Sequence, residues 1–284
     1  MPISIYLPNI RHKDSLPQED SSFSAPRVWA IADGVTRDPK LPENFNSKSI
    51  EDILAYYPRP SGAKVVANIF TKNFITLVKK NLSIKDIFQK INVLINIYNK
   101  KNIAKVDYLV NDFFACVACG AYIKNNILKY GFIGDSGMAI FNSKGKLNFC
   151  TKDGMQPFVD YENKFLKKSN FNWLMPEYRV LVRSEFRNYI KKPKEKKIVY
   201  GALTGEVEAM KFVTIGEKKV RQGSKIVFFS DGARQLVLSS DFSEFMKESL
   251  SQKLKTEIMN LSLQKAEKDY ENFGRERSMI IDNI

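Results

Sequence analysis

Residues 225–232 read KIVFFSDG, a run of apolar residues that ends abruptly in Ser, Asp and Gly. The β-branched and aromatic residues predict a buried strand, and the Asp-Gly pair predicts a turn directly after it. Residues 27–34, RVWAIADG, repeat this arrangement near the other end of the chain. A glycine beside such an aspartate lets the backbone approach an ion closely. The two stretches therefore predict strands that carry carboxylates at the edge of a sheet.

Two further acidic motifs extend this pattern. Residues 18–20 read QED, and residues 134–137 read GDSG after another apolar run. A single Asp-Gly pair is usually a plain turn, but four acidic motifs in one chain indicate a shared site. Hard divalent ions take carboxylate, carbonyl and water oxygens as ligands. Two such ions about 3.5–4 Å apart can clamp a phosphate and activate a water, so we expect a dinuclear metal centre.

The rest of the chain alternates between helical and strand patterns. Two stretches carry apolar residues every three or four positions and predict amphipathic helices, with Ser83 as the N-cap of the second. Shorter stretches, separated by turns at 125–126 and 143–145, predict a β meander. In chain order the predicted elements are a strand at 27–33, helices at 49–57, 63–78 and 84–98, strands at 113–123, 127–133, 138–141, 146–150 and 225–230, a helical region at 243–270, and a strand at 278–284.

This order predicts an α+β fold in which helices pack on antiparallel sheets. We interpret residues 1–284 as one domain. The segment at about 151–200 is polar and basic and has an irregular pattern, and we interpret it as a flap or insert.

The overall charge favours acidic partners. The chain has 45 Lys and Arg against 31 Asp and Glu, a formal charge of +14. Such a balance favours nucleic acid, an anionic membrane or an acidic protein. However, no basic stripe with interleaved aromatic residues and no nucleic-acid motif is present, so we interpret the charge as a solvated surface and expect no nucleic-acid partner. No apolar run is long enough for a membrane span, and the N-terminal residues do not read as a signal peptide.

The cysteines do not suggest a metal site. Cys116 and Cys119 form a C-x-x-C pair, but no second pair or nearby histidine completes a zinc site. We expect both to be buried strand residues on opposite faces of a sheet. The odd total of three, with Cys150, indicates a reducing compartment, and we expect a cytoplasmic monomer.

In order and spacing, the four acidic motifs resemble those of the PP2C/PPM family of metal-dependent Ser/Thr protein phosphatases. That family shows an acidic E-D near the N-terminus, then V-x-D-G, G-D-S and S-D-G. This chain shows QEDSSF, WAIADGVT, FIGDSGMAIF and IVFFSDGARQLV, and the resemblance covers essentially the whole chain. It implies a four-layer α-β-β-α sandwich of two antiparallel sheets with metal ions at one edge. It also implies hydrolysis of phosphoserine and phosphothreonine in proteins by a metal-activated water.

The resemblance assigns roles to individual residues. Asp33 would bridge two Mg²⁺ or Mn²⁺ ions and, with Asp231, would be catalytic. Glu19 and the carbonyl of Gly34 would hold one ion, Asp231 the other, and Asp20 would orient water. The Gly-Asp-Ser motif would help to recruit a third, weaker ion. The expected metal ligands are Glu19, Asp33, Gly34, Asp135, Asp231 and Glu276.

The C-terminal ligand is the main departure from the family pattern. The family closes with an aspartate before the final strand, and Arg275 stands in that place here. A slip of one residue would let Glu276 serve, which we favour, and Asp282 is the alternative. This departure leaves open a pseudophosphatase, in which the same fold acts as a binding or regulatory module.

The groups around the phosphate also differ from the family. Many members have a histidine shortly after the D-G motif, whereas this chain has only His12, which we interpret as a surface residue. Arg11, Lys13 and Arg37 are the candidates for binding the phosphate. The basic charge suggests an acidic phosphoprotein as the substrate.

Overall fold

The computed structural model describes residues 1–284 except 13, 48, 104–111, 170–172 and 189–197. Its strands form two sheets of five, and every neighbouring pair is antiparallel. The first sheet has the order β1 (Ile3–Leu7), β10 (Arg277–Asn283), β9 (Lys225–Phe229), β6 (Gly137–Phe141) and β7 (Leu147–Cys150). The second has the order β2 (Ser21–Ala25), β3 (Val28–Gly34), β4 (Cys116–Lys124), β5 (Ile127–Ile133) and β8 (Thr214–Lys219).

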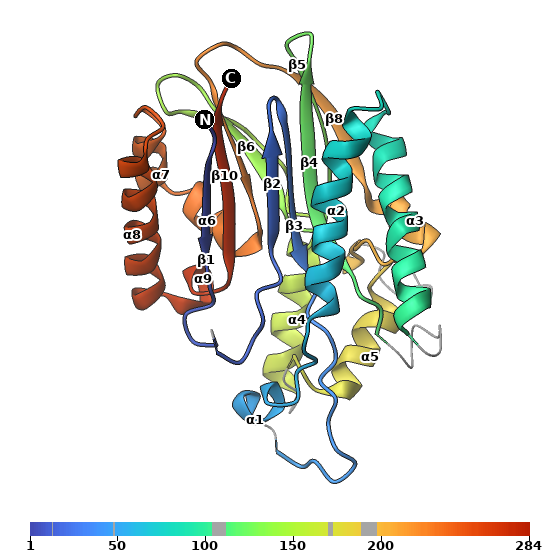
Figure 1. Cartoon of the computed structure of the whole chain (residues 1–284). Coiled ribbons are helices and arrows are strands. Elements are labelled where there is room, and N and C mark those ends of the chain that lie inside the picture. The colour runs from blue at the N-terminus through green and yellow to red at the C-terminus, as the bar shows by residue number, and fades with distance from the viewer. Residues whose placement is uncertain (13, 48, 104–111, 170–172, 189–197) are drawn as a thin grey trace.

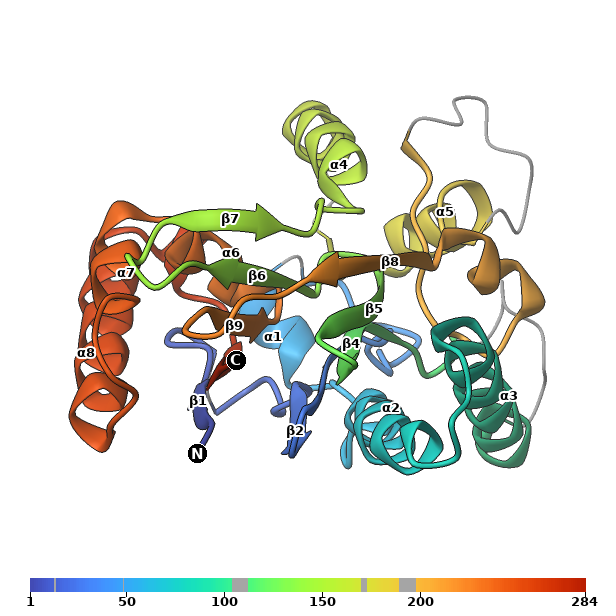
Figure 2. The same ribbon diagram turned by 90° about the horizontal axis from the view of Figure 1, so that it is seen from above.

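The two sheets lie face to face between two layers of helices (Figures 1 and 2). Alternation along the strands produces this arrangement, because successive side chains point to opposite faces. In β9, Phe228 points into the core between the sheets and stacks on Trp29 at 5.7 Å, whereas Phe229 points toward the outer helices. The helices are α1 (Ile50–Leu54), α2 (Gly62–Val78), α3 (Ile84–Asn102), α4 (Gln156–Lys168), α5 (Pro176–Glu185), α6 (Asp231–Val237), α7 (Ser240–Phe245), α8 (Gln252–Lys268) and α9 (Tyr270–Phe273), with a 3₁₀ helix at Val207–Phe212.

Each outer layer covers one sheet. Helices α2 and α3 pack on the second sheet through a cluster that contains Phe70, Phe74 and Phe88. Helices α6, α7 and α8 pack on the first sheet through residues such as Phe242 and Ile258. The predicted α+β sandwich with four layers is therefore confirmed.

Several local predictions are also confirmed. Ser83 caps α3, since its hydroxyl accepts the backbone N–H of Asp86. Asn125 and Asn126 form the β4–β5 turn with positive φ angles of 53° and 60°. Such angles are typical of a two-residue hairpin turn.

Both halves of the C-x-x-C pair behave as buried strand residues. Cys116 lies in the core between the second sheet and its helices, and Cys119 lies in the core between the sheets. Both are free thiols with no exposed surface. They therefore face opposite sides of β4, as predicted.

Other predictions differ from the structure. Strands β1, β2 and β8 were not predicted, whereas the helical region predicted at 243–270 is present and is divided into α7, α8 and α9. The irregular pattern expected at 151–200 is wrong, because this segment contains α4 and α5. Their apolar faces are narrow, and Phe158 is the one buried residue of α4. Most of the other side chains in this segment are polar or basic, so its sequence resembles that of a loop. That it forms an insert stays an interpretation.

In the part of the chain that the structure describes, no helix is both long and apolar enough to cross a membrane.

Candidate active site

Five acidic segments meet at one edge of the sandwich because the strands that carry them begin or end there. Strand β3 ends beside Asp33, β5 and β9 are followed by Asp135 and Asp231, and Glu276 directly precedes β10. The segment 19–20 precedes β2, which runs antiparallel to β3 with Ser21 paired to Ala32. Continuing that register by one residue sets Asp20 opposite Asp33. This edge faces the end of the molecule where α1, α4 and α5 lie (Figure 1).

Two glycines allow these segments to approach one another. A Cβ atom on Gly34 would lie 2.8 Å from the Cβ of Glu19, and a Cβ atom on Gly232 would lie 2.2 Å from the carbonyl oxygen of Glu276. Contacts below 3.0 Å between such atoms essentially do not occur. The glycine of each D-G motif therefore makes room for the neighbouring acidic segment.

The segment 19–20 is fixed by the C-terminal part of the chain. The carboxylate of Glu276 accepts the backbone N–H groups of Glu19 and Asp20 at 3.0 and 2.9 Å. The Oε1 atom of Glu19 accepts the hydroxyl of Tyr57 at 2.9 Å and also the hydroxyl of Ser61. Tyr57 and Ser61 were not predicted as site residues, and no local sequence pattern distinguishes them.

Asp20 is joined to the S-D-G motif. Its Oδ2 atom accepts the hydroxyl of Ser230 at 2.7 Å, and the Ser230 hydroxyl accepts the backbone N–H of Ser278 at 3.0 Å. Asp20 is only 3% exposed. The hydrogen bonds thus connect the starts of β2 and β10 with the end of β9.

The site is dominated by negative charge. Burial, followed by the charges of Asp20 and Asp231, raises the pKa of Asp33 well above its ordinary value. Burial and the charge of Glu276 raise the pKa of Asp20 in the same way. Burial raises the pKa of Glu19 to about 7, although its two hydroxyl donors oppose the shift. Burial and mutual repulsion therefore favour the protonated form of these carboxyl groups, and a bound cation would oppose that effect.

Asp135 has a second acidic neighbour. Burial, then the charges of Asp231 and Asp153, raise the pKa of Asp135 to about 8. Its Oδ1 atom is buried and has no hydrogen-bond partner among the described residues. Asp153 pairs with Arg234 at 3.5 Å and follows β7 in another Asp-Gly pair. That pair is the signal by which Asp153 could have been predicted.

Arg275 provides a cation at one side of the site. Its Nη1 atom lies 3.4 Å from Oδ2 of Asp231, and its side chain is 57% exposed. The charges of Asp231 and, after it, Asp135 raise the pKa of Arg275, while burial opposes the shift. Arg275 therefore stays positively charged beside the carboxylate that begins α6.

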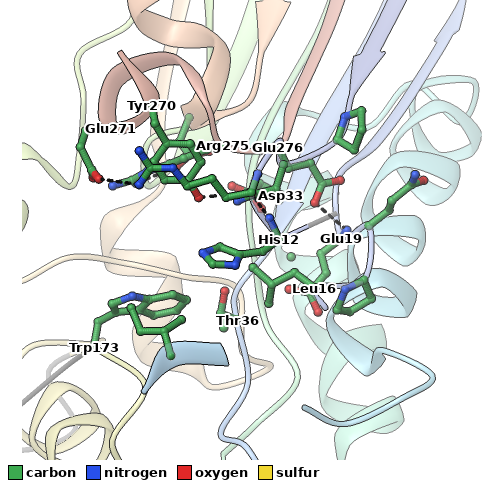
Figure 3. A pocket seen from close by; sticks show the side chains of 18 of the residues that line it. His12, Leu16, Glu19, Asp33, Thr36, Trp173, Tyr270, Glu271, Arg275 and Glu276 are labelled. Atoms are coloured by element: carbon green, nitrogen blue, oxygen red, sulfur yellow. Dashed lines mark hydrogen bonds and ion pairs between the residues drawn. The ribbon is translucent and has the colours of Figure 1, made fainter. Parts of the chain in front are cut away.

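A pocket of about 580 Å³ opens above these groups. Asp33, Asp231, Arg275 and Glu276 line its acidic end, and Trp173 lies across from them (Figure 3). The wall also contains His12, which is half-buried rather than on the open surface. The other lining residues include Arg11, Thr36, Glu51, Glu162, Leu166, Tyr270 and Glu271.

The candidate phosphate-binding residues have different positions. Arg11 lies at the pocket, where its guanidinium stacks on Tyr270 at 3.8 Å. Arg37 instead stacks on Phe114 and lies 3.7 Å from Asp112, and it is not among the lining residues. Lys13 lies outside the described residues.

The alternative C-terminal ligand is remote from the pocket. Asp282 accepts the indole N–H of Trp29 at 2.9 Å. It is six residues beyond Glu276 along β10, a separation of about 20 Å in a strand. Glu276 is therefore the acidic candidate at this position.

A buried ionic cluster attaches the pocket wall to the sandwich. Asp38, just after β3, contacts Arg179 at 3.1 Å and Arg183 at 2.5 Å, and both arginines belong to α5. Asp112 lies 3.3 Å from Arg187 and 3.5 Å from Arg179. Burial would raise the pKa of Asp112, but Arg187 and Arg179 lower it. This cluster holds α5 beside the chain that leaves Asp33.

The donor set suits a hard divalent cation, because it consists of carboxylates and backbone carbonyls. The crowded charges and the partnerless Oδ1 of Asp135 fit such an ion. Within the described ranges, no three His, Cys, Asp or Glu side chains are already arranged as ligands of one ion. Binding of an ion would therefore require these side chains to move closer together.

The two-sheet sandwich is similar in fold to solved structures of Ser/Thr phosphatases. No protein-family model and no curated protein sequence matches the chain. Among solved structures, it is similar to the Mycobacterium tuberculosis serine/threonine phosphatase PstP/Ppp, with 16% identity, a TM-score of 0.63 and coverage of 100% of this chain and 98% of that chain.

Two further structures have the same fold. The catalytic domain of PstP in complex with two manganese ions has 15% identity and a TM-score of 0.62, with 100% and 98% coverage. The photosystem II phosphatase PBCP has 13% identity and a TM-score of 0.59, again with 100% and 98% coverage. At these identities the likeness establishes the fold, and the predicted resemblance to PP2C proteins is confirmed at that level.

Proposed function

We propose that this protein is a metal-dependent phosphatase that hydrolyses phosphoserine and phosphothreonine in proteins. One observation carries the proposal: Asp33, Asp20, Asp135 and Asp231 converge on one edge of a PP2C-type sandwich, beside an open pocket. Carboxylates that raise one another's pKa attract cations strongly, and a bound Mg²⁺ or Mn²⁺ would neutralise their charge. The PstP structure with two manganese ions supports this choice of ion.

The acidic residues would have different roles in metal binding and catalysis. Asp33, the carbonyl of Gly34 and Glu19 would hold one ion. Asp135 and Asp231 would be ligands on the other side of Asp33. A divalent ion supplies positive charge to a phosphoryl oxygen and lowers the pKa of water. Asp20, fixed through Ser230, would orient the attacking water.

The charges of the pocket wall determine which phosphorylated segments can bind beside the acidic residues. Its wall offers Arg11 to a phosphate or a flanking acidic group, but it also carries Glu51, Glu162 and Glu271. The local wall thus lacks the basic excess of the whole chain. We therefore expect a phosphoprotein segment with neutral or basic flanks, rather than the acidic target that the overall charge suggests.

The decisive experiment measures hydrolysis of a phosphothreonine peptide with basic flanks across 0 to 10 mM MnCl₂. Activity should require Mn²⁺ and fall at least about a hundredfold in Asp33→Asn, the scale expected when an essential electrostatic group is lost. Asp14→Asn, an exposed site, is the matched control. Absence of turnover at every Mn²⁺ concentration would contradict the proposal.

A second function is favoured by the contact between Arg275 and Asp231. If this arginine prevents metal loading, the protein would be a pseudophosphatase that binds phosphoproteins without cleaving them. Binding of the same phosphopeptide to the metal-free protein, with no phosphate release, would distinguish this function from the first.

A further inference from the structure

The cations around the acidic edge are unevenly distributed. Asp231 is the one aspartate of the group with an ion pair to Arg275, at 3.4 Å, and the same guanidinium acts electrostatically on Asp135. On the opposite side, Asp33 has no ion pair with a described residue, and the Oδ2 atom of Asp20 accepts a neutral hydroxyl. On that side, Lys64 donates to the backbone carbonyl of Asp20, and the charge of Arg37 acts on Glu19. Asp231 is therefore paired directly with a guanidinium, whereas neither of these cations forms an ion pair with Asp33.

The backbone explains why the guanidinium lies there. Gly232 lets the carbonyl of Glu276 pass so closely that a Cβ would lie 2.2 Å from it. Glu276 is held in turn by the N–H groups of the segment 19–20. Arg275, the preceding residue, therefore starts its side chain directly beside Asp231, and its position follows from the same contacts that assemble the site.

We infer that Arg275 takes the place of one metal ion. The centre would then bind a single divalent ion tightly on the Asp33 side, with the guanidinium as the cation on the Asp231 side. This inference rests on the proposed function, since it assumes that the carboxylates bind metal. It departs from the two ions that were expected from the sequence.

The guanidinium can also contact the phosphate. An arginine has five N–H donors, and one Nη1 contact with Asp231 leaves others for a ligand in the pocket that Arg275 lines. Arginine is well suited to bind phosphoryl oxygens in this way. Because the side chain is 57% exposed, its pair with Asp231 is weak enough to be displaced at high metal concentration.

The test is the number of Mn²⁺ ions bound, measured by calorimetry and by electron paramagnetic resonance. The wild type should bind one ion tightly and show the six-line signal of isolated Mn²⁺. Arg275→Asp should bind a second ion at least about tenfold more tightly than the wild type and show a spin-coupled pair. Arg275→Ala should improve the second site less. Arg221→Asp, at an exposed position, controls for the change of net charge.

Each outcome separates the inference from the function on which it rests. Two ions of similar affinity in the wild type would overturn the inference and leave the proposed phosphatase intact. A single ion in both Arg275 variants, with unchanged melting temperature, would also overturn it. No Mn²⁺ binding by any of the proteins would overturn the metal centre itself, and the proposed function with it.

Discussion

The free energy of unfolding of the metal-free protein should depend on pH, because ionisation of its buried carboxyl groups destabilises the fold. Burial raises the pKa of Glu19 from 4.5 to about 7, and Glu19 is only 5% exposed. The folded protein therefore binds a proton more tightly at this residue than the unfolded chain does. Stability from this proton is fully present below about pH 4.5 and is lost as the pH rises to about 7.

The magnitude follows from the same numbers. One pKa unit corresponds to about 1.4 kcal/mol, so the shift at Glu19 corresponds to on the order of 3 kcal/mol. The pKa values of Asp33, Asp20 and Asp135 are also raised, so they act in the same direction. The basic net charge acts in the opposite direction, because acid adds further positive charge to a chain that already carries +14.

A matched variant separates these effects. Glu19→Gln cannot titrate, yet its amide oxygen can still accept the hydroxyls of Tyr57 and Ser61. Urea unfolding in EDTA should therefore show the wild type losing on the order of 3 kcal/mol relative to Glu19→Gln between pH 4.5 and 8. Millimolar Mn²⁺ should reduce this loss. A difference between the two proteins that stays constant over this pH range would refute the reasoning.

Two other substitutions test how the site is assembled. Asp112→Asn should lower the free energy of unfolding by about 3–5 kcal/mol, because it removes the buried negative charge that Arg187 and Arg179 contact; urea midpoints would show this, and the exposed Glu248→Gln should have no effect. Gly34→Ala should cost about 1–3 kcal/mol and weaken Mn²⁺ binding, since its new methyl group would lie 2.8 Å from the Cβ of Glu19; calorimetry showing unchanged Mn²⁺ affinity would contradict this account.

The central strands could be predicted because their own residues encode them. The stretch 225–229 is buried at every position, and the Ser-Asp-Gly sequence that follows it marks its end. The turn predicted at Asp231 and Gly232 is in fact the first turn of α6. The two edge strands of the second sheet, β2 and β8, lack such a signal. Strand β8, TIGEKK, is exposed at most positions, and β2, SSFSA, is short and polar. Their pairing depends on β5 and β3, which is information that lies elsewhere in the chain.

The same distinction applies to the site. Asp33, Asp135 and Asp231 could be proposed from sequence because a carboxylate at a strand end next to glycine is a local pattern. Tyr57 reaches Glu19 only through the path of the chain between β3 and α2. The position of Arg275 likewise depends on the crossing of two distant segments at Gly232. Contacts of this kind are properties of the fold and have no signature in the neighbouring residues.

The carboxylates destabilise the metal-free fold and are proposed to bind metal for the same physical reason. If repulsion and burial destabilise the empty site, an ion that relieves them gains that free energy on binding, and metal binding should release protons near neutral pH. Arg275 already relieves part of the repulsion at Asp231, whereas no described residue forms an ion pair with Asp33. We therefore expect two independent effects. Glu19→Gln should reduce the stabilisation by Mn²⁺, and Arg275→Asp should add a second bound ion. Each effect should be the same with or without the other substitution, because the two residues lie on opposite halves of the site.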